Sequence, residues 1–135
     1  MAKIVLTDAK VTINSVVLSD HISSITIDTK DDIVETTAFG SSAKTRVAGL
    51  QDNSVTLDFM QDFASANVEA TIYPLIGTAT TIVVQPTSSA ASTTNPTYTF
   101  SALVSEWQPL KGTIGSLATA SVTWPISGTI TKATA

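Results

Sequence analysis

The sequence predicts a mainly β fold, an antiparallel β-sandwich or barrel of about eight strands with one short flanking α-helix and a long hairpin loop. Three observations lead to this prediction. The 23 Thr and 16 Ser residues make up 39 of the 135 positions, and Thr, like Val and Ile, favours a pleated, half-buried surface. Short runs alternate apolar and polar side chains between clusters of Gly, Pro, Asn and Asp. One segment alone has the apolar spacing of an amphipathic helix.

The first strand signals lie near the N-terminus. Residues 10–18 alternate, with Val11 and Ile13 on one face. Within this segment, Asn14-Ser15 predicts a tight turn or a bulge. Residues 22–29 repeat the alternation and are expected to form the next strand.

Two alternating segments, residues 33–39 and 54–59, predict a hairpin in the middle of the sequence. A small, polar, weakly basic stretch lies between them and gives the hairpin a long loop at about residues 40–52. Gly49 and Asp52-Asn53 are expected to end this loop because they tolerate the positive φ that turns require. The region around this hairpin contains seven of the eleven acidic residues.

The helix is expected over residues 65–73. Ser65 is its predicted N-cap, and Ala66, Ala70 and Tyr73 share one face. A Pro and a Gly follow and end the element. Because a helix this short has little stability of its own, it has to pack on the sheet.

The last part of the sequence predicts four more strands and a loop. Residues 86–96, rich in Ser and Thr, are expected to form a surface loop rather than a linker. The strands are expected at residues 80–85, 97–107, 117–124 and 126–132. Together these elements form one domain, residues 1–135, a usual size for a single core.

Composition limits the classes of function. The chain has no Cys, which excludes disulfides, thiolate metal sites and cysteine nucleophiles. It shows no signal peptide and no apolar stretch near the 18 or so residues of a membrane helix, so we expect neither Sec export nor membrane insertion. A net charge of −4 argues against a surface that grips nucleic acid, but not against one that nucleic acid slides past.

The residues give little support to catalysis, and we expect no catalytic, cofactor-binding or metal site. His21 is the single histidine and follows Asp20, but neighbours on a strand point to opposite faces and are not expected to touch. Asp28, Asp31 and Asp32 could supply oxygens to Ca²⁺, yet the Gly and Glu of a calcium loop are missing, and a turn is the expected use of these residues.

The remaining candidates also have structural interpretations. Trp107 and Trp124 lie beside apolar strand residues and are expected in the core rather than in a sugar-binding cleft. Lys44 and Arg46 give too few charges for firm phosphate binding. An ion pair between subunits and a solvated loop tip are both open for them.

Several segments together resemble the tail tube (major tail) proteins of long-tailed bacteriophages. They are DIVETTAFG (32–40), TRVAGLQD (45–52), SVTLDF (54–59), Trp107 and VTWPISG (122–128). The resemblance covers most of the chain in order and length. It implies a β-sandwich flanked by a helix, which assembles into hexameric rings that stack into the tube through which the genome leaves the virion.

The resemblance also implies partners and places. The expected partners are copies of the same chain, other tail proteins such as the tape measure and terminator, and DNA in transient passage. The expected locations are the virion tail and, during assembly, the host cytoplasm. The loop after Phe39 would reach the neighbouring ring. The candidate inter-ring residues are Gly40, Lys44, Arg46, Gly49 and Asp52.

Strand geometry is consistent with such a tube. A wall roughly 40 Å across needs on the order of 25 strands at about 4.8 Å spacing, which six chains giving about four each can supply. An acidic, hydroxyl-rich channel would repel phosphates evenly and offer DNA no deep binding minimum. The candidate lumen-lining residues are Asp28, Asp31, Asp32, Glu35 and Asp58, with ordinary solvated carboxylates as the alternative.

Two other functions remain open from the sequence. A capsid-decorating or fibre-type β-sandwich module would stay monomeric or trimeric, whereas a tube protein would form rings or hollow tubes. A carboxylate-based hydrolase would need a deep pocket with two convergent carboxylates, and the sequence shows no sign of one.

Overall fold

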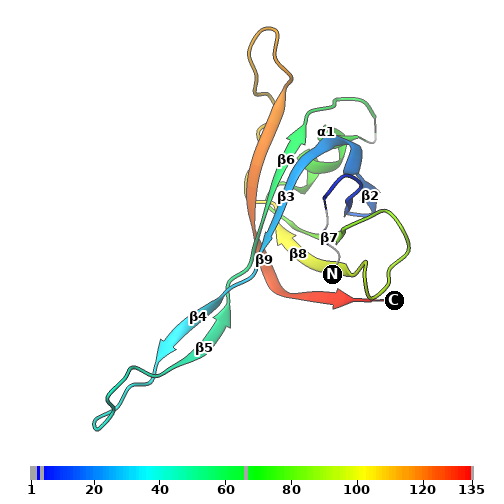
Figure 1. The fold of residues 1–135 in the computed structure, drawn as a ribbon. Coiled ribbons are helices and arrows are strands. Elements are labelled where there is room, and N and C mark those ends of the chain that lie inside the picture. The colour runs from blue at the N-terminus through cyan, green and yellow to red at the C-terminus, as the bar shows by residue number, and fades with distance from the viewer. Residues whose placement is uncertain (1–2, 4, 66, 135) are drawn as a thin grey trace.

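The computed structural model describes residues 3, 5–65 and 67–134. Within these residues the protein has nine strands and one short α-helix, which confirms the mainly β prediction (Figure 1). The strands are β1 (Lys10–Ile13), β2 (Val16–Val17), β3 (Ile22–Asp28), β4 (Asp31–Glu35), β5 (Arg46–Gln51), β6 (Ser54–Met60), β7 (Ala79–Gln85), β8 (Thr97–Leu103) and β9 (Thr119–Ala133). The helix is α1 (Val68–Ile72), followed by the 3-10 turn η2 (Tyr73–Leu75); a second 3-10 turn, η1 (Ser19–His21), precedes β3.

Seven strands form one antiparallel sheet in the order β2-β1-β7-β8-β9-β6-β3. The sheet curls into a half-barrel, while β4 and β5 form a separate hairpin that projects from the body (Figure 1). In the turn between β1 and β2, which form the first hairpin, Asn14 and Ser15 have φ values of 49° and 68°. Two successive positive φ values are typical of the tight turns that match the twist of a hairpin, so the turn predicted here is confirmed.

Strand β9 joins the two parts of the sheet. Its first half, from Thr119 to Pro125, pairs with β6, and its second half pairs with β8. Gly128, with φ of 95°, lies where the pairing with β8 shifts register, and this bulge bends the strand.

The prediction of two separate strands at residues 117–124 and 126–132 was therefore wrong, because β9 continues through Pro125. The backbone N–H groups of Ser121 and Thr123 point away from β6 towards side chains of a loop. Pro125 follows in the same alternation, so its missing N–H falls on the side that has no strand partner.

The core lies on the inner face of the curled sheet. Val55, Leu57 and Phe59 of β6 are buried and alternate with polar residues, and Trp124 of β9 is fully buried. Trp107 packs edge-on against Phe59, with ring centroids 5.3 Å apart. Both tryptophans thus contribute to the core as expected.

The helix begins later and buries a different face than predicted. It starts at Val68, and Val68 and Ile72 are fully buried while Tyr73 is exposed. These two residues bury more apolar surface than the alanines of the predicted face, of which Ala66 lies outside the described residues. Ser65 does not cap the helix, and Asp62 accepts the nearby backbone N–H groups instead. The Asp62 carboxylate accepts the N–H of Ala64, and the Asp62 backbone carbonyl accepts the N–H of Glu69.

The pairing predicted in the middle of the chain was also wrong. Strand β4 pairs with β5, and β6 pairs instead with β3 and β9. Residues 46–51, expected in the loop, form strand β5. Alternation along one strand does not select its partner; here the buried face of β6 draws it into the sheet, whereas β4 and β5 are exposed throughout.

Candidate functional site

The arm, defined here as residues 31–51, is the most unusual surface of the chain. Its strands β4 and β5 are exposed at every position. Ile33 and Leu50 are 73% and 82% exposed, and Phe39 near the tip is fully exposed. A two-stranded hairpin is marginally stable alone in water, and contiguous exposed apolar residues mark interaction sites. The arm therefore has the character of a surface that another protein covers.

Both faces of the arm are apolar. Ile33 lies opposite Ala48 in the ladder, and Val34 opposite Val47, so these two pairs point to opposite faces. Beyond β4 the ladder continues through Thr36, whose N–H donates to the carbonyl of Thr45 at 2.8 Å. An element that is apolar on both sides fits between two surfaces rather than on one.

The predicted inter-ring residues are spread along the arm. Gly40 and Lys44 lie in its tip loop, Arg46 stands opposite Glu35, and Asp52 lies at the root. Gly49, Asp52 and Asn53 do not have the positive φ expected of them. A Cβ at Gly49 would lie 3.2 Å from Val34 Cγ2 and 3.3 Å from Asp32 Cβ, so the lack of a side chain, not backbone freedom, explains this glycine.

The root of the arm is held by Asn53, which is only 2% exposed. Its side-chain oxygen accepts the N–H of Lys30 at 3.2 Å, and its carbonyl accepts the N–H of Ile126 at 2.9 Å. Its amide donates to Gln51 at 3.3 Å. Asn53 thus connects the start of the arm, its end and strand β9, and it sets the direction in which the arm leaves the body.

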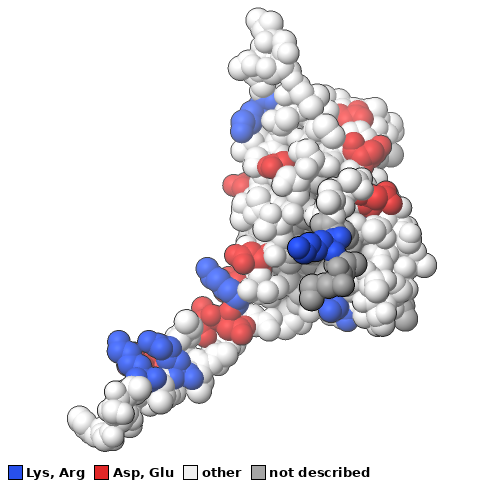
Figure 2. Space-filling model, in the orientation of Figure 1, with Lys and Arg blue, Asp and Glu red and all other residues white. Residues whose placement is uncertain are grey.

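The predicted lumen residues do not form one cluster. Asp31, Asp32 and Glu35 belong to β4, and Asp28 ends β3 beside the root. Figure 2 shows acidic side chains close to where the arm leaves the body and basic ones farther out on the arm. Asp58 instead lies on the body, on the side of β6 that faces away from the core.

Around Asp58 the structure assembles a surface that sequence reasoning missed. The outer sides of β3, β6 and β9 align rows of short polar side chains, which we call the hydroxyl face. Asp58 accepts a 2.6 Å hydrogen bond from the Ser121 hydroxyl, and the Thr56 and Thr123 hydroxyls lie 3.2 Å apart. The face consists of Ser24, Thr26, Ser54, Thr56, Asp58, Ser121 and Thr123. The polar positions of each strand were visible in the sequence, but their alignment depends on the register of three strands.

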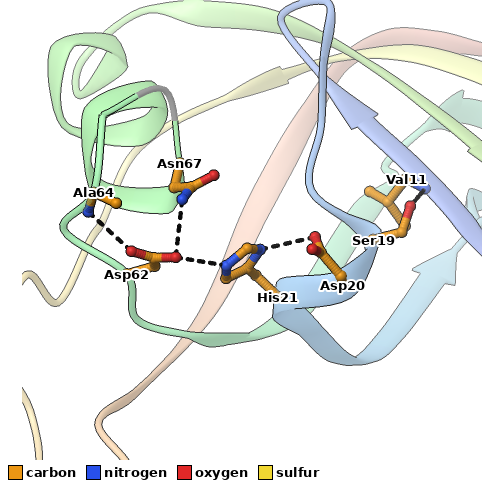
Figure 3. A network of polar contacts seen from close by, with 7 residues as sticks. All are labelled: Val11, Ser19, Asp20, His21, Asp62, Ala64 and Asn67. Carbon is orange, nitrogen blue, oxygen red and sulfur yellow. Dashed lines mark hydrogen bonds and ion pairs between the residues drawn. The ribbon is translucent and has the colours of Figure 1, made fainter.

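A polar network surrounds His21 (Figure 3). Its Nδ1 lies 2.8 Å from Asp20 Oδ1 and its Nε2 lies 2.8 Å from Asp62 Oδ2. The expectation that Asp20 and His21 would not touch was wrong, because the two residues lie in the 3-10 turn η1 and not on a strand. With both ring nitrogens bound to carboxylates, the ring has no nitrogen left to take a proton from a substrate. The network links η1 to the segment that precedes helix α1.

The charges of this network shift the pKa values of its members. Partial burial opposes the charged imidazole, but hydrogen bonds to Asp62 and Asp20 and their negative charges outweigh it and raise the pKa of His21 above 6.5. The N–H of Ala64, followed by the hydrogen bond from His21, lowers the pKa of Asp62 below 3.8. The pair therefore favours its charged form in the folded state.

Among the residues that the structure describes, no group of three or more His, Asp or Glu side chains lies close enough to hold a metal ion. In the same residues, no helix has the length and apolar character that a membrane crossing requires.

No protein-family model and no curated protein sequence matches the chain. Among solved structures, a chain in the virion of a native gene transfer agent (GTA) particle superposes with a TM-score of 0.72 at 10% identity, over 93% of this chain and 95% of that chain. A chain in the tail of an empty GTA particle, computed with helical refinement and C6 symmetry, gives 0.59 at 13% identity, over 82% and 81% of the two chains. A chain in the six-fold symmetrised baseplate of the anti-feeding prophage (AFP) gives 0.58 at 10% identity, over 98% and 97%. At these identities the likeness establishes a shared fold.

Replacing Asn53 by Ala should lower the free energy of unfolding by about 0.5–1.5 kcal/mol, because the partly buried hydrogen bond from the Lys30 N–H loses its acceptor. Urea unfolding of the unassembled protein measures this. Gln51→Ala is the matched control, since Gln51 is exposed and its loss leaves the hydrogen bonds from Lys30 and Ile126 to Asn53 in place, so it should change stability less than Asn53→Ala does. Equal stability of Asn53→Ala and the wild type would contradict the assigned role.

The His21 network should make stability depend on pH. The raised pKa of His21 adds to the free energy of unfolding; this stabilisation is complete below pH 6.5 and is lost as the pH rises through the folded-state pKa. The lowered pKa of Asp62 also adds to the free energy of unfolding, and this stabilisation is lost as the pH falls below 3.8. His21→Gln should therefore destabilise the protein more at about pH 5.5 than at about pH 8.5. Thermal melts at both values test this, with Ser23→Ala as the non-titrating control. An equal loss at both values would refute the coupling.

Proposed function

We propose that this chain is a structural virion protein that assembles into stacked hexameric rings and so forms a tail tube for genome delivery. The observation that supports this most is the arm, an apolar hairpin with no core of its own that projects from the body (Figure 1). Covering it requires another protein, and copies of the same chain are the simplest source. The likeness in fold to chains of GTA and AFP particles, two of them described with six-fold symmetry, agrees with this proposal.

The sheet also has edges that suit ring closure. Strand β3 ends the sheet, so one side of its backbone has no partner strand among the residues that the structure describes. On the other side of the β3-β6-β9 group, residues 106–111 run beside β9: Lys111 accepts the N–H of Thr119, and Glu106 accepts that of Thr123. With three strands and this segment, six copies would supply about 18 to 24 strands, close to the number that a DNA-sized channel needs.

In this proposal the hydroxyl face lines the channel together with some of Asp28, Asp31, Asp32, Glu35 and Asp58. Its side chains are short, mostly neutral and partly bonded to one another, as between Asp58 and Ser121. Such a surface repels phosphates weakly and offers no dense row of cations in which DNA would stall. The chain would act in the virion tail after assembly in the host cytoplasm, with tape measure and terminator proteins as further partners and without catalysis.

Raising the concentration of the purified protein should produce rings or hollow tubes in negative-stain images. Ile33→Asp combined with Leu50→Asp should abolish them while leaving a folded monomer, because both residues are exposed on the arm and outside the core. Thr93→Asp in the exposed loop is the control and should assemble normally. A wild type that stays monomeric or trimeric at every concentration would favour a capsid-decorating or fibre-type module instead.

The channel assignment has its own test. Asp28→Lys with Asp58→Lys places two cations beside the hydroxyl face, and genome release from particles carrying these tubes should become slower, most clearly at low salt. Asp31→Lys with Asp32→Lys makes the same charge change on the arm. Comparing the two double variants shows whether the carboxylates beside the hydroxyl face or those on the arm line the channel. If tubes are normal and release is unchanged in both variants, neither set of carboxylates lines the channel.

A further inference from the structure

The half-barrel is open on one side, and an apolar groove lies in this opening. A hollow of about 770 Å³ lies between β3 and the ends of β7 and β8. A second hollow of about 430 Å³ shares Ile27 and Tyr98 with the first and extends it towards the end of β9. We call the two together the seam groove; its main apolar lining residues are Leu6, Ile25, Ile27, Val84, Tyr98 and Ile130.

The seam groove is a part of the core that the described residues leave uncovered. Ile25 and Ile27 are inner-face residues of β3, yet they stay only partly buried, whereas Val55 and Leu57 on the neighbouring strand are completely buried. Leaving such side chains open to water forgoes the stabilisation of about 25 cal/mol for each Å² of apolar surface. A second apolar element laid into the groove would recover it.

We propose that the seam groove receives the arm of a second copy of this chain. The inference rests on the proposed self-assembly and names the surface that the arm contacts. Of the apolar side chains on the arm, Ile33 and Leu50 are the most exposed in its two strands. The groove in turn has an apolar lining that stays open in the part of the chain that the structure describes. The exposed apolar side chains of the arm would therefore be buried against the apolar lining of the groove.

The charges of the groove and of the root half of the arm are also complementary, while the basic residues Lys44 and Arg46 lie farther out on the arm. Lys3 lines the first hollow and Lys132 the second. On the arm, Asp31, Asp32 and Glu35 lie in the same strand as Ile33. An arm lying in the groove would bring these carboxylates towards the two amines, which favours this occupant over a basic or purely apolar segment.

The contact has to be between copies. The arm extends away from its own body (Figure 1), and the hydrogen bonds of Asn53 and Asp52 hold its root in that direction. Because the arm and the seam groove are different surfaces, the contact is head-to-tail and repeats from one copy to the next. Such a contact builds rings or stacks, in agreement with the proposed tube.

Single cysteines test the contact, since the chain has none of its own. An isotopically heavy Leu50→Cys protein is mixed with a light Thr94→Cys protein, because Thr94 lies at the groove and is exposed. After assembly and oxidation, mass spectrometry should find the heavy–light disulfide between arm and groove. Heavy Leu50→Cys with light Ser116→Cys, in the loop before β9, is the control and should give no such product.

A bulky side chain in the groove provides a second measurement. Ala9→Trp should raise the concentration needed for polymerisation on the order of tenfold or more, as expected when a central contact is blocked, while circular dichroism shows a folded protein. Ala90→Trp in the exposed loop should change it little. Normal tubes without the arm–groove disulfide, or Ala9→Trp tubes that form as readily as the wild type, would overturn the groove assignment and leave self-assembly intact. Absence of tubes in the wild type would overturn both.

Discussion

The fold depends on the shared pairing of β9. Its first half completes the group β3-β6-β9, and its second half continues through β8 and β7 to the first hairpin. Trp124, at the centre of this strand, is fully buried and donates its indole N–H to the carbonyl of Glu106 at 2.8 Å. The bulge at Gly128 bends the strand and so lets one sheet curl around a core. The bend thus brings the two groups of strands together around one core, to which helix α1 adds Val68 and Ile72.

The same curl leaves the domain incomplete. Seven strands close the core over β6 and β9 but not over β3, where Ile25 and Ile27 border the seam groove. The arm, in contrast, has exposed apolar residues and no core of its own in which they are buried. In the proposed assembly a protein that exposes both a groove and an apolar hairpin gains stability by association, and the direction of the arm, held at Asn53, favours a neighbour as the source of that gain.

The comparison of sequence and structure is clearest at three places. Asn14-Ser15 predicts a tight turn or a bulge, and the structure has the turn, because the chemistry of a tight turn lies in the turn residues themselves. Pro125 was taken as a strand end, although a proline is tolerated wherever its missing N–H faces no partner strand, and only the pairing reveals that side. The contact between Asp20 and His21 was missed because a 3-10 turn brings neighbours together where a strand separates them.

What the sequence determined by itself is local: the mainly β composition, most of the strand segments except β5 and the continuity of β9, the tight turn and the positions of the acidic residues. These features arise from each residue and its near neighbours, so alternation and turn chemistry are enough to find them. Only the tertiary structure decided that β4 pairs with β5 rather than β6, that the hydroxyl face joins three strands, and that the seam groove stays open. The physical reason is that strand partners and uncovered surfaces depend on contacts between residues far apart in the chain, which compete for the same core.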